Sequence, residues 1–188
     1  MATVDTIEAP PALMTAEEHL RHHGDGRTEL VRGHLEERPV PGERHGEVAG
    51  YVYLRLATWG LPRGYKVFIE AGNVLERDPD TVRLPDVSAV AASKLPGGRA
   101  ATGYGEVPPD LAVEVRSPGQ SLRHLRGRMA EYAAAGTPLG WIVDPEASTV
   151  EVFGHGQSTG VRAVGESVSG GNALPGFECE VRLLMEAV

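Results

Sequence analysis

Two carboxylates lie in apolar, strand-like stretches of the sequence, where charged side chains are uncommon. Asp86 begins the run 86–91, and Glu114 lies inside the run 110–116. An ionised carboxylate in such surroundings is costly without a partner. A divalent metal ion would be one partner, because two carboxylates on neighbouring strands and a main-chain carbonyl such as that of Val115 supply the oxygen ligands that Mg²⁺ takes. An ion pair is the alternative, with Arg83, Arg116 or Arg128 as the partner, and the spacing leaves both interpretations open.

Glu114 is expected on the charged face of a strand. Apolar residues alternate along 110–116, so Leu111, Val113 and Val115 point one way while Ala112, Glu114 and Arg116 point the other. A helix is then predicted from the cap Ser121 to Ala135, with Leu122, Leu125, Met129 and Tyr132 on one side. At about 100° per residue, Arg128 lies beside this stripe, so the helix can direct it toward the two carboxylates.

The remaining elements predict a mixed sheet with helices packed on it, an α/β (α+β) fold with an N-terminal β-hairpin and C-terminal β additions. A capping box of Thr15 and Glu18 predicts a short helix, and Gly33 lies between two half-apolar runs over 29–36, the pattern of a hairpin or a bulged strand, of which we predict the hairpin. An apolar stripe of period three to four predicts a helix over 43–59. Short β-rich runs at 65–70, 73–76, 82–84 and 86–91 indicate an antiparallel meander, and two further strands are predicted at 139–143 and 149–153.

Size and composition indicate one folded domain. The chain has 188 residues and a net charge of −8, which excludes a general polyanion-coating protein and leaves room for a local basic patch. Residues 1–12 are predicted to be a disordered arm, and 13–188 a single domain. The single Cys179 cannot form an intramolecular disulfide, and no apolar run approaches the roughly 20 residues of a spanning helix. We therefore expect a cytoplasmic protein without a membrane partner.

Two other patterns are given plain interpretations. His19, His22 and His23 have a helical spacing that could hold zinc, but no further ligand completes the site, so we predict a solvated helix face. The segment 156–160 fits the expression G-x-S-x-G, which would make Ser158 the nucleophile of a serine hydrolase. It links two predicted strands and opens no helix, so a hairpin loop is expected there.

Several short motifs together resemble one protein family. They are Leu-Pro-Asp-Val-Ser at 84–88, Pro-Pro-Asp-Leu-Ala-Val-Glu-Val-Arg-Ser-Pro at 108–118, the helix end 128–138 and Trp-Ile-Val-Asp-Pro at 141–145. In order and spacing they resemble the Uma-type putative restriction endonuclease family, which is placed in the PD-(D/E)xK nuclease superfamily. The resemblance covers about residues 13–185 and also takes in 29–31, His45, 169–171 and 174–177. It implies a restriction-endonuclease-like fold, in agreement with the elements predicted above.

The resemblance also implies roles for individual residues. Asp86 matches the aspartate of the motif and Glu114 its acidic position, which makes them metal ligands. The motif lysine is replaced: Arg116 stands two residues after Glu114, and Arg128 stands where this family commonly carries a lysine in the following helix. A guanidinium cannot act as a base, but it can orient a phosphate and stabilise negative charge.

Glu29 and His45 match positions that the family tends to keep. Glu29 could reach the metal or its water, and His45 could relay a proton or contact phosphate. Each has a plain alternative as a polar residue that ends a strand or opens a helix.

We therefore expect a nuclease that uses Mg²⁺ or Mn²⁺ to hydrolyse phosphodiester bonds of nucleic acid, as an endonuclease of DNA. A homodimer is expected because cutting both strands needs two sites. The alternative is a nuclease-like domain without cleavage activity that binds nucleic acid or protein, as the absence of the motif lysine and the net charge suggest.

Overall fold

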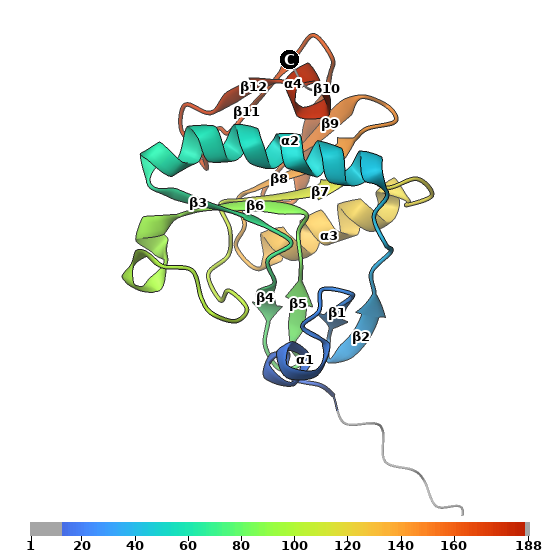
Figure 1. The fold of residues 1–188 in the computed structure, drawn as a ribbon, viewed down its shortest axis with the longest axis vertical. Helices are drawn as coiled ribbons and strands as arrows, with labels where there is room; N and C mark the ends of the chain where they lie inside the picture. Colours follow the sequence, from blue (N-terminus) through green and yellow to red (C-terminus); the bar gives the residue numbers. More distant parts are fainter. Residues whose placement is uncertain (1–12, 187–188) are drawn as a thin grey trace, which may run out of the picture.

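A six-stranded mixed sheet forms the centre of the molecule in the computed structural model, which describes residues 13–186 (Figure 1). The predicted arm over 1–12 lies outside the described residues. The strand order is β10-β9-β8-β7-β6-β3; β7 and β8 are parallel and the other neighbours antiparallel. The strands are β3 (Tyr65–Ile69), β6 (Val87–Ala91), β7 (Leu111–Val115), β8 (Leu139–Asp144), β9 (Thr149–Gly154) and β10 (Gln157–Ala163). Helices flank the sheet, as predicted.

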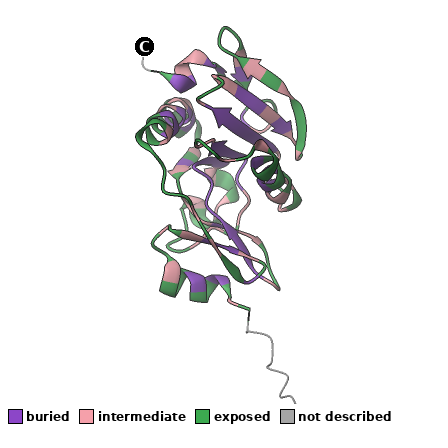
Figure 2. Cartoon of the chain, turned by 90° about the vertical axis from the view of Figure 1, so that its right-hand side faces the viewer, coloured by how far each residue is buried: buried purple, intermediate pink, exposed green. Residues whose placement is uncertain are grey.

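Helix α2 (Glu43–Gly60) covers one face of this sheet, and it confirms the helix predicted over 43–59. Val48, Val52 and Leu56 are buried along one side of α2. They pack on the odd-numbered side chains of the strands, including Val113 and Trp141. Each such side chain contributes about 1.5–3 kcal/mol when it leaves water. This face of the sheet is therefore the main apolar core, and its buried strands are visible in Figure 2.

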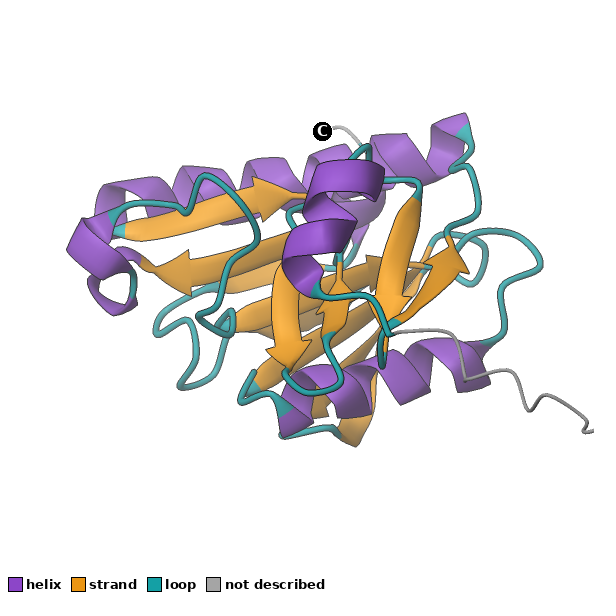
Figure 3. Ribbon diagram, turned by 90° about the horizontal axis from the view of Figure 1, so that it is seen from below, coloured by secondary structure: helices purple, strands orange, loops and turns teal. Residues whose placement is uncertain are grey.

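Helix α3 (Leu122–Ala134) lies on the opposite face, as Figures 1 and 3 show. Ser121 caps it by accepting a hydrogen bond from the N–H of His124 at 3.2 Å, as predicted. Leu125, Met129 and Tyr132 pack against the even-numbered Ala112 and Ile142. Gly140 permits the close approach, because a Cβ there would lie 2.6 Å from Met129 Sδ. Helix α3 therefore rests on β7, β8 and β9.

A second sheet extends from the central one, with strand order β2-β1-β5-β4. Its strands are β1 (Thr28–Val31), β2 (His34–Glu37), β4 (Asn73–Glu76) and β5 (Thr81–Arg83). The predicted hairpin is confirmed, with Gly33 at a φ of 78° in its turn. The predicted meander is wrong: β3 pairs with β6, while β4 and β5 leave the central sheet and β5 pairs with β1. The hairpin cannot bury Leu30 by itself, and Val82 and Leu84 supply the apolar partners.

Helix α1 (Ala16–His23) begins at the predicted capping box of Thr15 and Glu18. The solvated histidine face predicted for it is wrong at His19, which is fully buried. His19 Nε2 lies 3.0 Å from Thr28 Oγ1, and its Nδ1 lies 2.7 Å from the hydroxyl of Tyr104. Both ring nitrogens thus have partners, and the buried imidazole joins α1 to β1 and to the loop before β7.

The C-terminal additions pack on the same face as α2. Strands β11 (Ser167–Ser169) and β12 (Glu178–Glu180) pair with each other and precede the short helix α4 (Arg182–Met185). Short 3₁₀ turns occur at Leu61–Arg63, Ala92–Lys94 and Pro96–Gly98. Ser158 lies exposed in strand β10, so the predicted hairpin loop over 156–160 is in fact mostly strand, and no nucleophile elbow forms. Within residues 13–186, no helix is both long and apolar enough to cross a membrane.

Candidate active site

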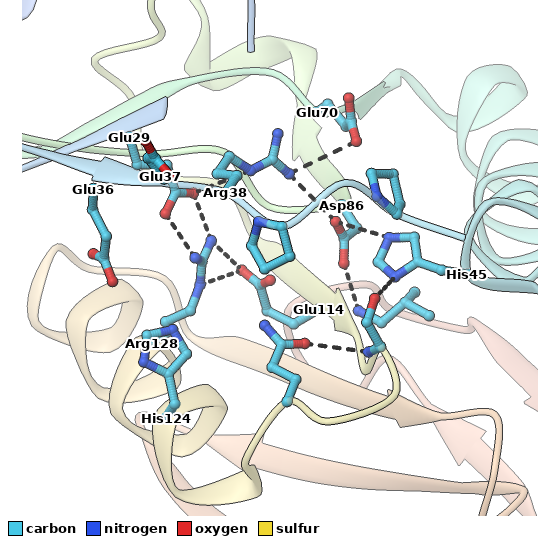
Figure 4. Close-up of a pocket in the computed structure, with 15 residues that line it drawn as sticks. Glu29, Glu36, Glu37, Arg38, His45, Glu70, Asp86, Glu114, His124 and Arg128 are labelled. Atoms are coloured by element: carbon cyan, nitrogen blue, oxygen red, sulfur yellow. Dashed lines mark hydrogen bonds and ion pairs between the residues drawn. The ribbon is translucent and has the colours of Figure 1, made fainter. Parts of the chain in front are cut away.

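A cleft of about 250 Å³ opens where the two sheets meet the N-terminal turns of α2 and α3 (Figure 4). Its ionisable lining is mainly acidic, with the carboxylates Glu29, Glu36, Glu37, Glu70, Asp86 and Glu114 against the two arginines Arg38 and Arg128. His45 and His124 also line it. The predicted carboxylates therefore share one cavity, and its charge favours a cation.

Asp86 lies immediately before β6 and is 5% exposed. The N–H of Val115 donates a hydrogen bond to its Oδ2 at 2.6 Å. On the other oxygen, His45 Nε2 lies 3.3 Å and Arg38 Nη2 lies 3.5 Å from Oδ1. Asp86 is thus held to the end of β7, beside Glu114, as the sequence predicted. The same contacts leave its charge only loosely paired.

Glu114 lies in the middle of the sheet on β7 and is 4% exposed. Its Oε1 accepts hydrogen bonds from the hydroxyl of Tyr132 at 2.7 Å and from Arg128 Nε at 3.0 Å. Its Oε2 accepts no hydrogen bond from the described residues, and it is not one of their buried polar atoms without a partner, so it faces the open cleft. Burial raises the pKa of Glu114 to about 7; Arg128 opposes this rise, and Asp86 adds to it. One carboxylate oxygen at the cleft wall is therefore available to a proton or a metal ion.

Glu29, by contrast, is fully engaged. It is 1% exposed, and Arg128 forms a two-bond pair with it at 2.7 and 2.6 Å. Arg83 Nη1 donates to it at 2.9 Å and the N–H of Leu84 at 2.7 Å. Burial raises its pKa, but Arg128 and Arg83 outweigh that effect and the net shift is downward. Glu29 therefore stays ionised as the centre of an internal ion cluster.

Of the two arginines predicted for the site, Arg128 reaches the carboxylates and Arg116 does not. Arg128 projects from α3 to Glu114 and Glu29, as its helical position predicted, and it is 6% exposed. Arg116 is not brought to the carboxylates, which corrects the prediction. It lies just beyond β7, so strand alternation no longer directs its side chain; Nη1 pairs with Asp144 at 2.6 Å and Nε donates to the carbonyl of Gln120 at 3.0 Å.

His45 joins Asp86 to the turn after β7. It lies in the first turn of α2, and its Nδ1 shares a hydrogen bond of 3.0 Å with Ser117 Oγ. Burial lowers the pKa of His45, but the bond and charge of Asp86 outweigh burial and raise it. His45 is thus placed to hold a proton beside Asp86, and Ser117 is a contact that the sequence did not reveal.

Two further residues of the cleft escaped the sequence analysis. Glu70 follows β3 with a φ of 48°, and its N–H donates to the carbonyl of Asp86 at 3.2 Å. Pairing of β3 with β6 places Glu70 opposite Asp86, so the correct pairing would have revealed it. Arg38 follows β2 in a proline-rich connection, where no periodicity signals a side-chain direction.

No three His, Cys, Asp or Glu side chains between residues 13 and 186 converge closely enough to form a metal site by themselves. The donor set still suits Mg²⁺, which takes one or two carboxylates and fills its octahedron with water and substrate phosphate. Asp86 and the free oxygen of Glu114 provide such a pair. The cleft therefore fits a magnesium-type ion and does not fit an all-protein cage.

The fold and the comparisons agree on the class of protein: a mixed sheet flanked by helices, of the restriction-endonuclease-like type. The model of the Uma2 family, described as "Putative restriction endonuclease", matches residues 16–182, so the chain belongs to the Uma2 family.

A solved structure supports the same fold. It is the crystal structure of "a putative nuclease belonging to DUF820" from Anabaena variabilis ATCC 29413, with a TM-score of 0.75 and 22% sequence identity. The match covers 92% of this chain and 97% of that one. None of the curated proteins matches the chain.

Proposed function

We propose that this nuclease-family protein is a metal-dependent endonuclease that hydrolyses phosphodiester bonds of DNA. The observation that carries the proposal is the unpartnered Oε2 of the buried Glu114, beside Asp86, in a cleft lined mostly by carboxylates. Glu114 as a whole is almost fully buried, and its oxygen Oε2 is open to the cleft and not used by any contact that holds the fold together. A cation in the cleft would bind this oxygen and balance the buried charge.

Asp86, Glu114 and the main-chain carbonyl of Val115 would hold Mg²⁺ or Mn²⁺. When bound, such an ion polarises the scissile phosphate and lowers the pKa of a water molecule. The chain's own residues set the geometry: Val115 N–H and His45 orient Asp86, while Tyr132 and Arg128 orient Glu114. Glu29 acts indirectly, because it holds Arg128 in place.

The reaction is a hydrolysis. The oxygen of water bonds to phosphorus as the ester P–O bond breaks; the water loses one proton, and the departing oxygen gains one. His45 lines the cleft with its Nε2 3.3 Å from Asp86 Oδ1, and we assign to it the uptake or release of a proton. Cleavage of both strands would need two copies of the site, so we propose a homodimer as the working form.

A second candidate function has its own support. Arginine stands at both positions where the related families carry lysine, and Arg116 pairs with Asp144 outside the cleft. The alternative is therefore a domain that binds nucleic acid or protein without cleaving. It predicts binding without turnover at any metal concentration.

Cleavage of plasmid, single-stranded DNA and RNA in Mg²⁺, Mn²⁺ or EDTA separates the two candidates. We expect cleavage of DNA that requires the metal and is lost in Asp86→Asn and Glu114→Gln. Glu178→Gln is the matched control, because Glu178 is exposed on β12 and does not line the cleft. Full metal-dependent cleavage by both cleft variants would contradict the assignment. Binding of DNA without cleavage by the wild type would favour the alternative.

A further inference from the structure

We propose that Arg38, rather than Arg128 or Arg116, is the cation that contacts the phosphate of the substrate in this cleft. The inference rests on the proposed nuclease function. It concerns a residue in the connection between β2 and α2, outside every motif of the sequence analysis.

Arg128 has little capacity left for a substrate. A guanidinium carries five N–H groups. Arg128 uses one on Glu114, two on Glu29 and one on the hydroxyl of Tyr132. Its charge is balanced by two buried carboxylates, and turning it toward a phosphate would leave both uncompensated. Arg128 is therefore a positioning residue.

Arg38 is anchored by hydrogen bonds to main-chain carbonyls and makes no hydrogen bond to a carboxylate. Its Nη1 donates to the carbonyl of Gly26 at 3.0 Å and its Nη2 to that of Leu84 at 3.4 Å. Main-chain carbonyls hold the side chain but carry no net charge. Three carboxylates lie farther away and form only long ion pairs, at 3.5 Å for Asp86, 3.7 Å for Glu70 and 3.9 Å for Glu29. Its side chain is 15% exposed, so N–H groups remain for an anion that enters the cleft.

The backbone at Arg38 is held in place before any substrate binds. The N–H of Arg38 donates to the carbonyl of Arg27 at 2.9 Å, and Pro39 restricts the backbone of the residue before it. Asp86 and Arg38 therefore stand side by side, one suited to a metal ion and the other to a phosphate oxygen (Figure 4). A fixed positive charge at the reacting phosphate needs no rearrangement during the reaction.

This arrangement has two opposite consequences. The charge of Arg38 attracts the phosphate, but it repels a divalent ion at Asp86, only 3.5 Å from Nη2. Removal of the charge should therefore weaken cleavage and DNA binding while it strengthens metal binding. If Arg38 had only a structural role, its removal would lower cleavage, DNA binding, metal binding and thermal stability together.

The experiment compares the wild type with Arg38→Met and Arg38→Lys. Arg182→Met is the matched control, because it removes the same charge from an exposed side chain on α4. Three quantities are measured: the metal-dependent cleavage rate, the affinity for Mn²⁺ by calorimetry without DNA, and the affinity for a labelled DNA duplex in EDTA. The melting temperature is recorded for every variant.

We expect Arg38→Met to lower kcat by about 10²-fold, the usual effect of losing one charge-stabilising donor. Its affinity for Mn²⁺ should rise by roughly tenfold, as expected from two charges a few ångströms apart in water. DNA binding in EDTA should weaken, Arg38→Lys should recover most of both effects, and Arg182→Met should match the wild type. Wild-type cleavage by Arg38→Met, or weaker Mn²⁺ binding in parallel with a lower melting temperature, would overturn the inference.

Failure of the proposed function would look different. If the wild type binds Mn²⁺ and DNA without cleaving, the opposite changes in the two affinities still test Arg38, and equal affinities overturn its role. If the wild type binds neither, the metal-dependent nuclease and the role of Arg38 both fall.

Discussion

Glu29 and Glu114 are two buried glutamates that share Arg128, yet their surroundings give them opposite properties. Glu29 lies where β1, β5 and α3 meet, and both its oxygens accept hydrogen bonds from Arg128, Arg83 and Leu84 N–H. Glu114 has partners on one oxygen only. The pKa of Glu29 is lowered, whereas that of Glu114 is raised to about 7. The difference distinguishes a carboxylate that holds the structure together from one that is available for chemistry.

The largest effect is expected from Glu114→Gln on activity. The amide keeps the shape of the side chain but removes the charge that would hold the metal ion, so metal-dependent DNA cleavage should fall by about 10³-fold or more, a loss typical of a group that acts on the transition state. Steady-state cleavage of a labelled duplex measures it. Folding should be retained, and a rate within tenfold of the wild type would remove the contrast with Glu29.

The next effect concerns stability at Glu29. Glu29→Gln removes the carboxylate that Arg83 and Arg128 share, although Arg128 keeps Glu114 and Arg83 keeps Glu131 and Glu36. The free energy of unfolding should therefore drop by about 3 kcal/mol, the lower end of the loss from breaking a buried ion pair. Denaturation by urea at neutral pH measures the change, with Glu178→Gln as a surface control. Glu114→Gln should cost far less in the same experiment. Equal losses for the two cleft variants would show that both carboxylates are structural.

Opposite pH dependences should follow from the two pKa shifts. Folded Glu114 binds more protons than the unfolded chain between pH 4.5 and about 7, so its contribution to the free energy of unfolding falls as the pH rises through this window. A tenfold difference in proton affinity between the folded and unfolded chain corresponds to about 1.4 kcal/mol. Glu29 contributes stability above the unfolded pKa of 4.5 and loses it as the pH falls through its lowered folded pKa.

Urea denaturation from pH 3 to 8 tests both slopes. The difference between the wild type and Glu114→Gln should appear between pH 4.5 and 7, and saturating Mg²⁺ should reduce it, because the ion competes with the proton. Identical profiles for the two proteins would contradict the raised pKa of Glu114.

The smallest effect is expected from Tyr132→Phe. The hydroxyl of Tyr132 donates to Glu114 Oε1 at 2.7 Å, and its loss should lower stability by about 1 kcal/mol at neutral pH. The same loss should raise the pKa of Glu114 further, because an ionised carboxylate loses a donor. The pH profile of cleavage should then shift upward. An unchanged profile would mean that Tyr132 only fills space between α3 and the sheet.

The sequence predicted those parts of the fold that depend on local periodicity. Helices α2 and α3 and the hairpin of β1 and β2 follow from apolar spacing, caps and Gly33, and all three are confirmed. The pairing of β3 with β6 could not be predicted in this way. Four short β-rich runs in succession fit a meander equally well, and the deciding contact, Leu30 with Val82, joins residues far apart in the chain.

In the candidate site, too, local patterns in the sequence predicted some residues, and long-range pairing placed the others. Carboxylates in apolar runs drew attention to Asp86 and Glu114, the family resemblance assigned them to the site, and helical spacing directed Arg128 toward them. Arg116 was placed by counting two residues past Glu114, but the strand ends at Val115 and the alternation ends with it. Arg38 belongs to no sequence motif. It lies beside Asp86 only because the second sheet brings the end of β2 to the cleft.

The ion cluster around Glu29 also has a mechanical consequence. It joins β1, β5 and α3 at a single point, so the second sheet and the helix are coupled directly and not through a flexible connection. Arg38 follows the strand next to β1, and Asp86 lies shortly after β5. The spacing between these two side chains is therefore set by this ion cluster in the wall of the cleft. A strand of nucleic acid would therefore meet a cleft in which the distance between Arg38 and Asp86 is fixed before binding.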